Sequence, residues 1–163
     1  MIKPRHKMLA FYGVKTTDTT QTPPVTTTTL TRMRNFTQLS QSKNPQEHSR
    51  KYVDEKDQRT DVMGHAPQID YAFDRDNTDA VLADIISITD SESVGEDAVR
   101  TIVLVDTDTG KAIRRDYSVI PSSEGDDANI YTHSGSFKAN GEKVHGTAAT
   151  SDDWKTCTFE EDE

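Results

Sequence analysis

The residues best placed to bind a metal ion are the two aspartates of the run Asp106 to Gly110, which reads DTDTG. Aspartates at alternate positions before a glycine are typical of the first half of a calcium-binding loop, where their carboxylates supply oxygen ligands. Here Ala112 occupies the position of a further ligand, and no glutamate follows at the spacing of the bidentate ligand. We therefore expect a hairpin turn at this run and no metal site.

Histidines and the single cysteine are the other candidate ligands and nucleophiles. The five histidines form no HExxH or His-Asp-Ser pattern, and the phosphate-binding patterns GxGxxG and GxxxxGK[ST] do not occur. His133 and His145 flank an expected hairpin turn and could form a metal pair across it, but two exposed strand histidines are the favoured interpretation. Cys157 lacks CxxC spacing, which favours a half-buried strand cysteine. No catalytic, cofactor-binding or metal-binding residue is predicted, and we expect no enzyme activity.

The sequence predicts strands most clearly between Asn129 and Phe159, and these strands would position several of the residues above. Polar and apolar residues alternate in this region, and glycines interrupt the pattern. Asn140-Gly141 is the strongest short signal for a hairpin turn. We expect an antiparallel meander here, with Trp154 buried in a strand.

A strand and a helix are predicted next to each other in the middle of the chain. Residues 68–74 alternate, so Ile69, Tyr71 and Phe73 should point to one face of a strand. The run Asn77 to Asp79 has the residue types of a helix N-cap, and the apolar residues that follow fall on one stripe of a short helix. These stripe residues are Val81, Leu82, Ile85 and Ile86. We expect this helix to cover one sheet, with Asp79 and Asp84 explained by helix-end electrostatics and exposure to solvent.

Two continuous apolar runs predict further strands, Met8 to Val14 near the N-terminus and Thr101 to Val105 before the DTDTG turn. Between residues 16 and 31, ten of sixteen positions are threonine, and Pro23-Pro24 interrupts them. Threonine favours extended backbone, whereas the prolines exclude a regular central strand. This segment is predicted to be an extended arm or a long hairpin, and a mucin-like glycosylated stalk is the compositional alternative.

The stretch from Phe36 to Gln68 has few large apolar residues and no sustained strand or helix periodicity. Loops longer than about 12 to 15 residues are uncommon in compact domains unless they are functional or disordered. Two short groups stand out as anchors that would dock on another subunit, and we predict their members as subunit-contact residues: Tyr52, Val53, Asp54, Val62 and Met63. The segment should become ordered only against another subunit; a disordered insertion is the alternative.

The composition indicates that the chain does not bury a complete hydrophobic core by itself. A chain of 163 residues fits one domain, but 32% hydrophobic residues and a mean hydropathy of −0.78 are low for a monomer that must bury its own core. Part of the chain is therefore extended or buried by other subunits. No apolar run approaches the roughly 20 residues needed to cross a bilayer. The apolar core near the N-terminus is too short for a secretory signal, so we expect synthesis in a cytoplasm and no membrane insertion.

The net charge of −9 is unevenly distributed. Residues 1–35 carry six Lys or Arg and one Asp, whereas residues 61–163 carry eight Lys or Arg and twenty-three Asp or Glu. Such an acidic body argues against a groove that grips nucleic acid, because that requires a positive face. The basic N-terminal arm could meet an acidic body of a neighbouring subunit; a solvated surface with a loose tail is the alternative.

The order of short motifs between roughly residues 50 and 160 resembles the major tail (tail tube) proteins of long-tailed bacteriophages of Gram-positive hosts. Each motif is a strand or turn signature, and their succession at suitable intervals carries the resemblance. The Thr-rich segment has no counterpart in it. The motifs are Lys51 to Glu55, Gln68 to Asp74, the helix, Val94-Gly95, Ile102 to Asp106, Ser134 to Gly141, Val144 to Thr147 and Thr156 to Phe159.

The resemblance implies a mainly β fold, an antiparallel β-sandwich or barrel with one flanking α-helix, a long extended N-terminal arm and a long loop. Residues 1–35 would be the N-terminal strand and Thr-rich arm. Residues 36–67 would be the long loop between subunits, and residues 68–163 the remainder of a single tube domain.

The resemblance also implies hexameric rings that stack into the tail tube, a virion structure that conducts DNA from capsid to host. The tape measure protein would lie inside the tube, and the tail terminator and distal tail proteins at its ends. DNA would pass without specific binding, because an acidic lumen repels phosphates. Two alternatives are the tube of a headless phage-derived bacteriocin or injection particle, and a monomeric β-sandwich adhesin or carbohydrate-binding module.

Overall fold

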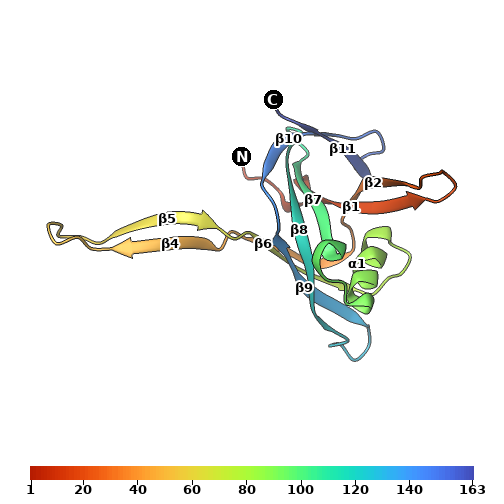
Figure 1. Cartoon of the computed structure of the whole chain (residues 1–163), viewed down its shortest axis with the longest axis horizontal. Coiled ribbons are helices and arrows are strands. Elements are labelled where there is room, and N and C mark those ends of the chain that lie inside the picture. Colours follow the sequence, from red (N-terminus) through yellow and green to blue (C-terminus); the bar gives the residue numbers. More distant parts are fainter.

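The computed structural model of the protein describes all 163 residues and consists mainly of antiparallel strands (Figure 1). This confirms the expected fold class of a β-sandwich or barrel with one flanking helix. In chain order the elements are η1 (Arg5–Lys7), β1 (Met8–Asp18), β2 (Val25–Arg32), β3 (Phe36–Ser42), β4 (Pro45–Arg50), β5 (Arg59–His65), β6 (Gln68–Asp74), α1 (Ala80–Ser91), η2 (Gly95–Ala98), β7 (Val99–Asp106), β8 (Lys111–Glu124), β9 (Thr132–Ala139), β10 (Val144–Ala149) and β11 (Thr156–Glu161).

Strand β8 closes the sheet into a barrel. One edge of β8 pairs with β7. Along its other edge, residues 111–114 pair with β10 and residues from Tyr117 onward pair with β9. Because β10 also pairs with β11, and the order continues through β2, β1 and β7 back to β8, six strands form a closed ring. Strands β9, β6 and β3 extend the sheet beyond this ring, and β3 is its open edge.

Strands β1 and β7 are buried on both faces. Phe11 and its register partner Val103 belong to the smaller core cluster, inside the barrel, together with Cys157. Tyr12 and its partner Ile102 belong to the larger cluster on the outer face. Burial on both faces explains why these strands have continuous apolar runs instead of alternation. Burial is also the main cause that raises the pKa of the Cys157 thiol to about 11, so this strand cysteine stays protonated at neutral pH.

The larger core cluster lies between helix α1 and the outer face of the sheet. The rings of Tyr71 and Phe137 stack at its centre, with centroids 4.6 Å apart. Both predicted apolar faces are confirmed, since their residues are buried: Ile69, Tyr71, Phe73, Val81, Leu82, Ile85 and Ile86. None of the helices has the length and apolar character needed to cross a bilayer.

Asp84 fastens helix α1 to the barrel. Its carboxylate accepts a hydrogen bond from the Tyr12 hydroxyl at 2.5 Å and one from Nε of Arg100 at 2.9 Å. Both partners are largely buried, and burial raises the pKa of Tyr12 well above its ordinary value. The expectation that Asp84 is a solvent-exposed helix residue is therefore wrong, because strands β1 and β7 each send a donor to it.

His133 is buried, although an exposed strand histidine was expected. Only 2% of the residue is exposed, and neither ring nitrogen has a hydrogen-bond partner. The ring stacks on Phe73 at a centroid distance of 5.1 Å, and its Nδ1 lies 3.6 Å from Oε2 of Glu124. Burial lowers the pKa of His133, and the charge of Glu124 opposes this shift only partly. His133 belongs to the aromatic face that β6 and β9 share. The residues next to it in the sequence did not indicate that it would be buried there.

The predicted hairpin at Asn140-Gly141 is wrong. Strands β9 and β10 pair with successive parts of the same edge of β8, so the chain continues in one direction through residues 140–143. His133 and His145 lie opposite residues 124 and 113 of β8, which are about 35 Å apart along a strand. The two histidines therefore do not face each other. Closure of the barrel overrides the local turn signal.

Three other segments have more structure, or a different structure, than expected. The Thr-rich segment forms the β1–β2 hairpin, one of its two interpretations. Residues 36–67, expected to be a loop, contain β3, which pairs with β6, and the hairpin of β4 and β5. Trp154 lies in a turn with left-handed backbone, φ 62°, instead of in a strand. Its ring packs against Phe11 at a centroid distance of 6.1 Å.

Asp79 is the N-cap of helix α1, as predicted. Its Oδ1 accepts hydrogen bonds from the N–H groups of Val81 and Leu82 at 3.0 and 3.3 Å. Replacing Asp79 with Ala should lower the free energy of unfolding by about 1 kcal/mol, because these N–H groups lose their acceptor. Asp79→Asn keeps an acceptor and should stay close to the wild type. Chemical denaturation followed by circular dichroism measures both, and equal losses in the two variants would contradict the capping role.

His133 should make stability fall as the pH decreases from 7 to 5. Its pKa in the folded protein lies below the unfolded value of about 6.5, so the unfolded state takes up a proton first as the pH falls. His133→Phe keeps a ring against Phe73 without a titrating group and should flatten this dependence. The control is His145→Gln, which replaces an exposed histidine of β10 outside this aromatic face. Thermal unfolding at several pH values decides; an unaltered slope in His133→Phe would refute the assignment.

Candidate subunit interface

A two-stranded hairpin, formed by β4 and β5, projects from the body of the protein (Figure 1). Every residue of these two strands except Gly64 is exposed. The strands pair only with each other, in a sheet separate from the main one. From Pro45 to its tip the hairpin reaches about 30 Å, at roughly 3.3 Å per residue. A hairpin of two strands is at best marginally stable in water, so this one needs a surface to pack against.

The tip of the hairpin has a defined shape. Two guanidinium groups lie over the Tyr52 ring, with the Cζ atoms of Arg50 and Arg59 at 5.7 and 5.5 Å from its centroid. Arg59 also forms an ion pair with Glu55, whose N–H donates to the Tyr52 carbonyl at 3.1 Å. These contacts hold the tip in one conformation, which lowers the ordering cost of binding.

The five predicted contact residues all lie on this hairpin. Tyr52, Val53 and Asp54 are in the tip, and Val53 is fully exposed. Val62 and Met63 are on β5, where they are 59% and 71% exposed. The register shifts between Gln46 and Glu47 of the opposite strand, so Met63 is the extra residue of a β-bulge. The structure thus places these residues on one projecting element, with one group at its tip and the other near its base. Their role as subunit contacts stays a prediction.

The base of the hairpin is held firmly. The N–H of Ala66 donates to the carbonyls of Lys43 and Asn44, at 3.1 and 3.2 Å, and the Asn44 amide donates to the Ala66 carbonyl at 3.0 Å. Asn44 has left-handed backbone, φ 44°, which asparagine tolerates better than most residues. These bonds set the direction in which the hairpin leaves the body, whereas its two strands beyond the base have no surface to pack against.

The outer end of the β1–β2 hairpin is a second projection. Strand β1 pairs with β7 only as far as Tyr12, and beyond it residues 13–18 pair with β2 alone. Strand β2 meets β11 at only two positions, Leu30 and Thr31, so its edge is open from Val25 to Thr29. The threonine side chains on this part are exposed to solvent. An open strand edge is a ready template for pairing with another chain.

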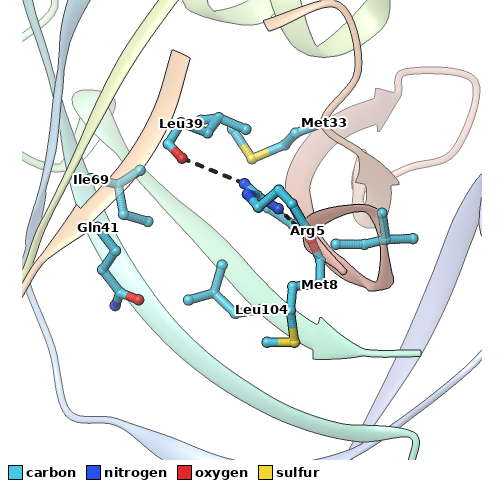
Figure 2. A pocket seen from close by; sticks show the side chains of 9 residues that line it. Arg5, Met8, Met33, Leu39, Gln41, Ile69 and Leu104 are labelled. Carbon is cyan, nitrogen blue, oxygen red and sulfur yellow. Dashed lines mark hydrogen bonds between the residues drawn. The ribbon is translucent and has the colours of Figure 1, made fainter. Parts of the chain in front are cut away.

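An apolar hollow lies beside the open edge strand β3 (Figure 2). Its volume is about 200 Å³, and seven of its nine lining residues are hydrophobic. Figure 2 shows Leu39, Ile69, Met33, Met8 and Leu104 around it, with Arg5 reaching across. The Arg5 guanidinium donates to the carbonyls of Met8, at 2.6 Å, and Leu39, at 3.4 Å. The hollow has room for an aliphatic side chain.

The N-terminal segment is bound to its own chain. Lys3 forms ion pairs with Asp106 at 2.9 Å and Asp108 at 2.7 Å, and the Lys7 carbonyl accepts two hydrogen bonds from Thr107. These bonds raise the pKa of Lys3 and lower the pKa values of both aspartates. The DTDTG run is the turn of the β7–β8 hairpin, as expected. The aspartates of this turn are thus an acidic partner for Lys3 within the same chain, which differs from both interpretations of the basic arm, a contact with a neighbouring subunit and a loose tail.

No protein-family model matches this sequence, and no curated protein matches it. Among solved structures, a similar chain is found in the cryo-EM structure of the anti-feeding prophage (AFP) baseplate, 6-fold symmetrised. The two chains are 11% identical and superpose with a TM-score of 0.47. The alignment covers 89% of this chain and 97% of the baseplate chain.

Proposed function

We propose that this chain is a structural subunit of a phage tail tube, as the major tail protein of a long-tailed bacteriophage. In this proposal six copies form a ring, and rings stack into a tube that conducts DNA from capsid to host. The tape measure protein occupies the lumen, and terminator and distal tail proteins close the ends. The role is structural and not catalytic.

The projecting hairpin of β4 and β5 is the observation that carries this proposal. It combines a stiff base, a shaped tip and three exposed aliphatic side chains, those of Val53, Val62 and Met63. A monomer gains nothing from exposing such side chains on a projecting hairpin, with Val53 at its tip, about 30 Å out, and Val62 and Met63 opposite Glu47 near its base. A repeating assembly does, because each copy can bury its arm on the next one. An element of this kind on every subunit would link copies in a repeating, head-to-tail manner.

The open edges of the sheet support the same assembly. Strand β3 has no partner on its outer side, and β2 is unpaired over residues 25–29. A solitary protein usually covers or charges such edges. Neither β3 nor the open part of β2 carries a charged residue before Arg32. Pairing between copies would satisfy these backbone groups and join the sheets of neighbouring subunits.

The charge of the chain suits a conduit for DNA. A net charge of −9 per copy is multiplied sixfold in the proposed ring. An acidic lumen repels phosphates, so that DNA slides without adhering. The arrangement of aromatic residues disfavours the adhesin alternative, because the stacked rings of Tyr71, Phe73 and Phe137 are in the core and not on an exposed platform.

Electron microscopy of the purified protein tests this proposal. The wild type should form rings or tubes about 100 Å wide, a dimension expected for a ring of small domains. The double variant Val53→Asp with Met63→Asp should remain dispersed, because charged side chains at these positions cannot be buried without a partner.

A matched control places the same two charges elsewhere. Ile2→Asp with Val94→Asp changes residues that are 92% and 79% exposed but lie outside the hairpin, and it should assemble like the wild type. Circular dichroism establishes that each variant is folded. A wild type that stays monomeric at high concentration, or a hairpin variant that assembles normally, would refute the proposal.

A further inference from the structure

A groove with an apolar floor and a basic rim lies between the N-terminal segment and the loop before β3. It continues from the hollow of Figure 2 and has a volume of about 710 Å³. Its floor includes Met8, Met33 and Phe36, and its rim carries Arg32 and Arg34. Neither of these arginines forms an ion pair or a side-chain hydrogen bond within the chain. In a protein whose net charge is −9, this is a local concentration of unpaired positive charge over apolar surface.

A surface of the opposite charge lies where β8 leads into β9. The loop of residues 125–131 carries Asp126 and Asp127. Glu92, which follows helix α1, lies beside Ser122 to Glu124, the end of β8 that leads into this loop. Within this acidic end two apolar side chains are exposed, Ile130 at 53% and Tyr131 at 48%. The acidic end therefore offers a complement to the groove: exposed apolar side chains on a loop that carries Asp126 and Asp127.

The acidic end is fixed in shape. The Asp127 carboxylate accepts hydrogen bonds from the N–H groups of Asn129, at 2.7 Å, and Ile130, at 3.2 Å. The Tyr131 carbonyl accepts from the N–H of Arg75 at 2.8 Å, and the Arg75 guanidinium lies over the Tyr131 ring. A preorganised surface of this kind loses little conformational entropy when it binds.

The groove and the acidic end do not meet within one molecule. Asn35, next to Arg34, donates a hydrogen bond to Asp79 at the start of helix α1. Glu92 follows the last residue of that helix. Twelve helical residues span about 18 Å, so helix α1 keeps Glu92 apart from the Arg34 end of the groove. Arg32 and Arg34 form no ion pair within the chain, so both are free to pair with carboxylates of another copy.

We propose that the acidic end of one copy docks in the basic groove of the next. Ile130 and Tyr131 would lie on the apolar floor, and Glu92 and Asp126 would face Arg32 and Arg34. The contact uses different surfaces on the two partners, so it repeats from copy to copy and builds a ring or a stack. This inference rests on the proposed function only in that copies of the chain associate.

Charge reversal on each surface tests the docking. Arg32→Glu with Arg34→Glu alters the groove, and Glu92→Lys with Asp126→Lys alters the acidic end without removing a side-chain hydrogen bond. Each double variant alone should associate about tenfold more weakly or worse in sedimentation velocity, because like charges then face each other. An equimolar mixture should recover association, since an intact groove meets an intact acidic end and a reversed groove meets a reversed one.

Controls with the same change in net charge are available on other exposed residues. Lys138→Glu with Lys143→Glu matches the groove variant, and Glu142→Lys with Glu160→Lys matches the acidic-end variant. Both should associate like the wild type. The milder changes Arg34→Gln and Asp126→Asn should weaken association in the same direction, and they keep the test valid if a reversal impairs folding. Added salt should weaken wild-type association, as expected for charged surfaces.

Two outcomes overturn the docking: reversal variants that associate like their controls, or a mixture no stronger than its separate components. The result is distinguishable from failure of the proposed function. If copies associate through the groove but electron microscopy shows no rings or tubes, the tube function fails and the docking stands. If the reversal variants form normal tubes, the docking fails and the tube function stands.

Discussion

The pairing of strand β8 with both β9 and β10 is the interaction on which the rest of the structure depends. Its 14 residues are enough to place β10 beside one part of an edge and β9 beside the next. The first pairing closes six strands into a barrel, and the second extends the sheet over which helix α1 packs. Closure removes the open edges of most strands and leaves one edge of β3 and one edge of the outer part of β2 unpaired. The two core clusters and the proposed assembly surfaces follow from this division of one edge of β8 between β9 and β10.

The small number of apolar residues is the second constraint on the structure, because it limits how much of the chain can be covered. Only 25 of the 163 residues are buried. Most of them form two clusters, one of 6 residues inside the barrel and one of 15 under the helix. Nothing is left to cover the β4–β5 hairpin, whose strands are held by backbone hydrogen bonds and one side-chain hydrogen bond, between Ser49 and Thr60. The uncovered parts are nevertheless shaped: the base of the hairpin is bonded to Asn44 and Ala66, and the acidic loop to its own Asp127. Structured but uncovered elements are what a subunit needs to join identical copies.

The sequence predicted the structure wherever burial leaves a periodic signature. Alternation placed β6, an N-cap and an apolar stripe placed α1, and continuous apolar runs marked β1 and β7. Prediction from the sequence failed where strand pairing depends on residues far apart in the chain. Asn140-Gly141 has the residue types of a hairpin turn, but the flanking strands β9 and β10 both pair with the same edge of β8 and therefore run in the same direction. The contact residues of the hairpin were found because Val53, Val62 and Met63 interrupt a polar stretch. The pairing of β4 with β5 was not predicted, because β4 buries neither of its faces and its sequence therefore shows no alternation of polar and apolar residues. The groove was also missed, because its floor and rim come from three separate segments.

Hydrogen exchange of the backbone amides of residues 45–65 tests most directly the claim that this chain is completed by its own copies. In dilute monomer these amides should exchange rapidly while those of β1 and β7 stay protected, because the hairpin then has no surface to pack against. In the assembled protein they should become protected as well. If the hairpin amides of the dilute monomer were already as protected as the barrel strands, the hairpin would be stable by itself and the account would be contradicted.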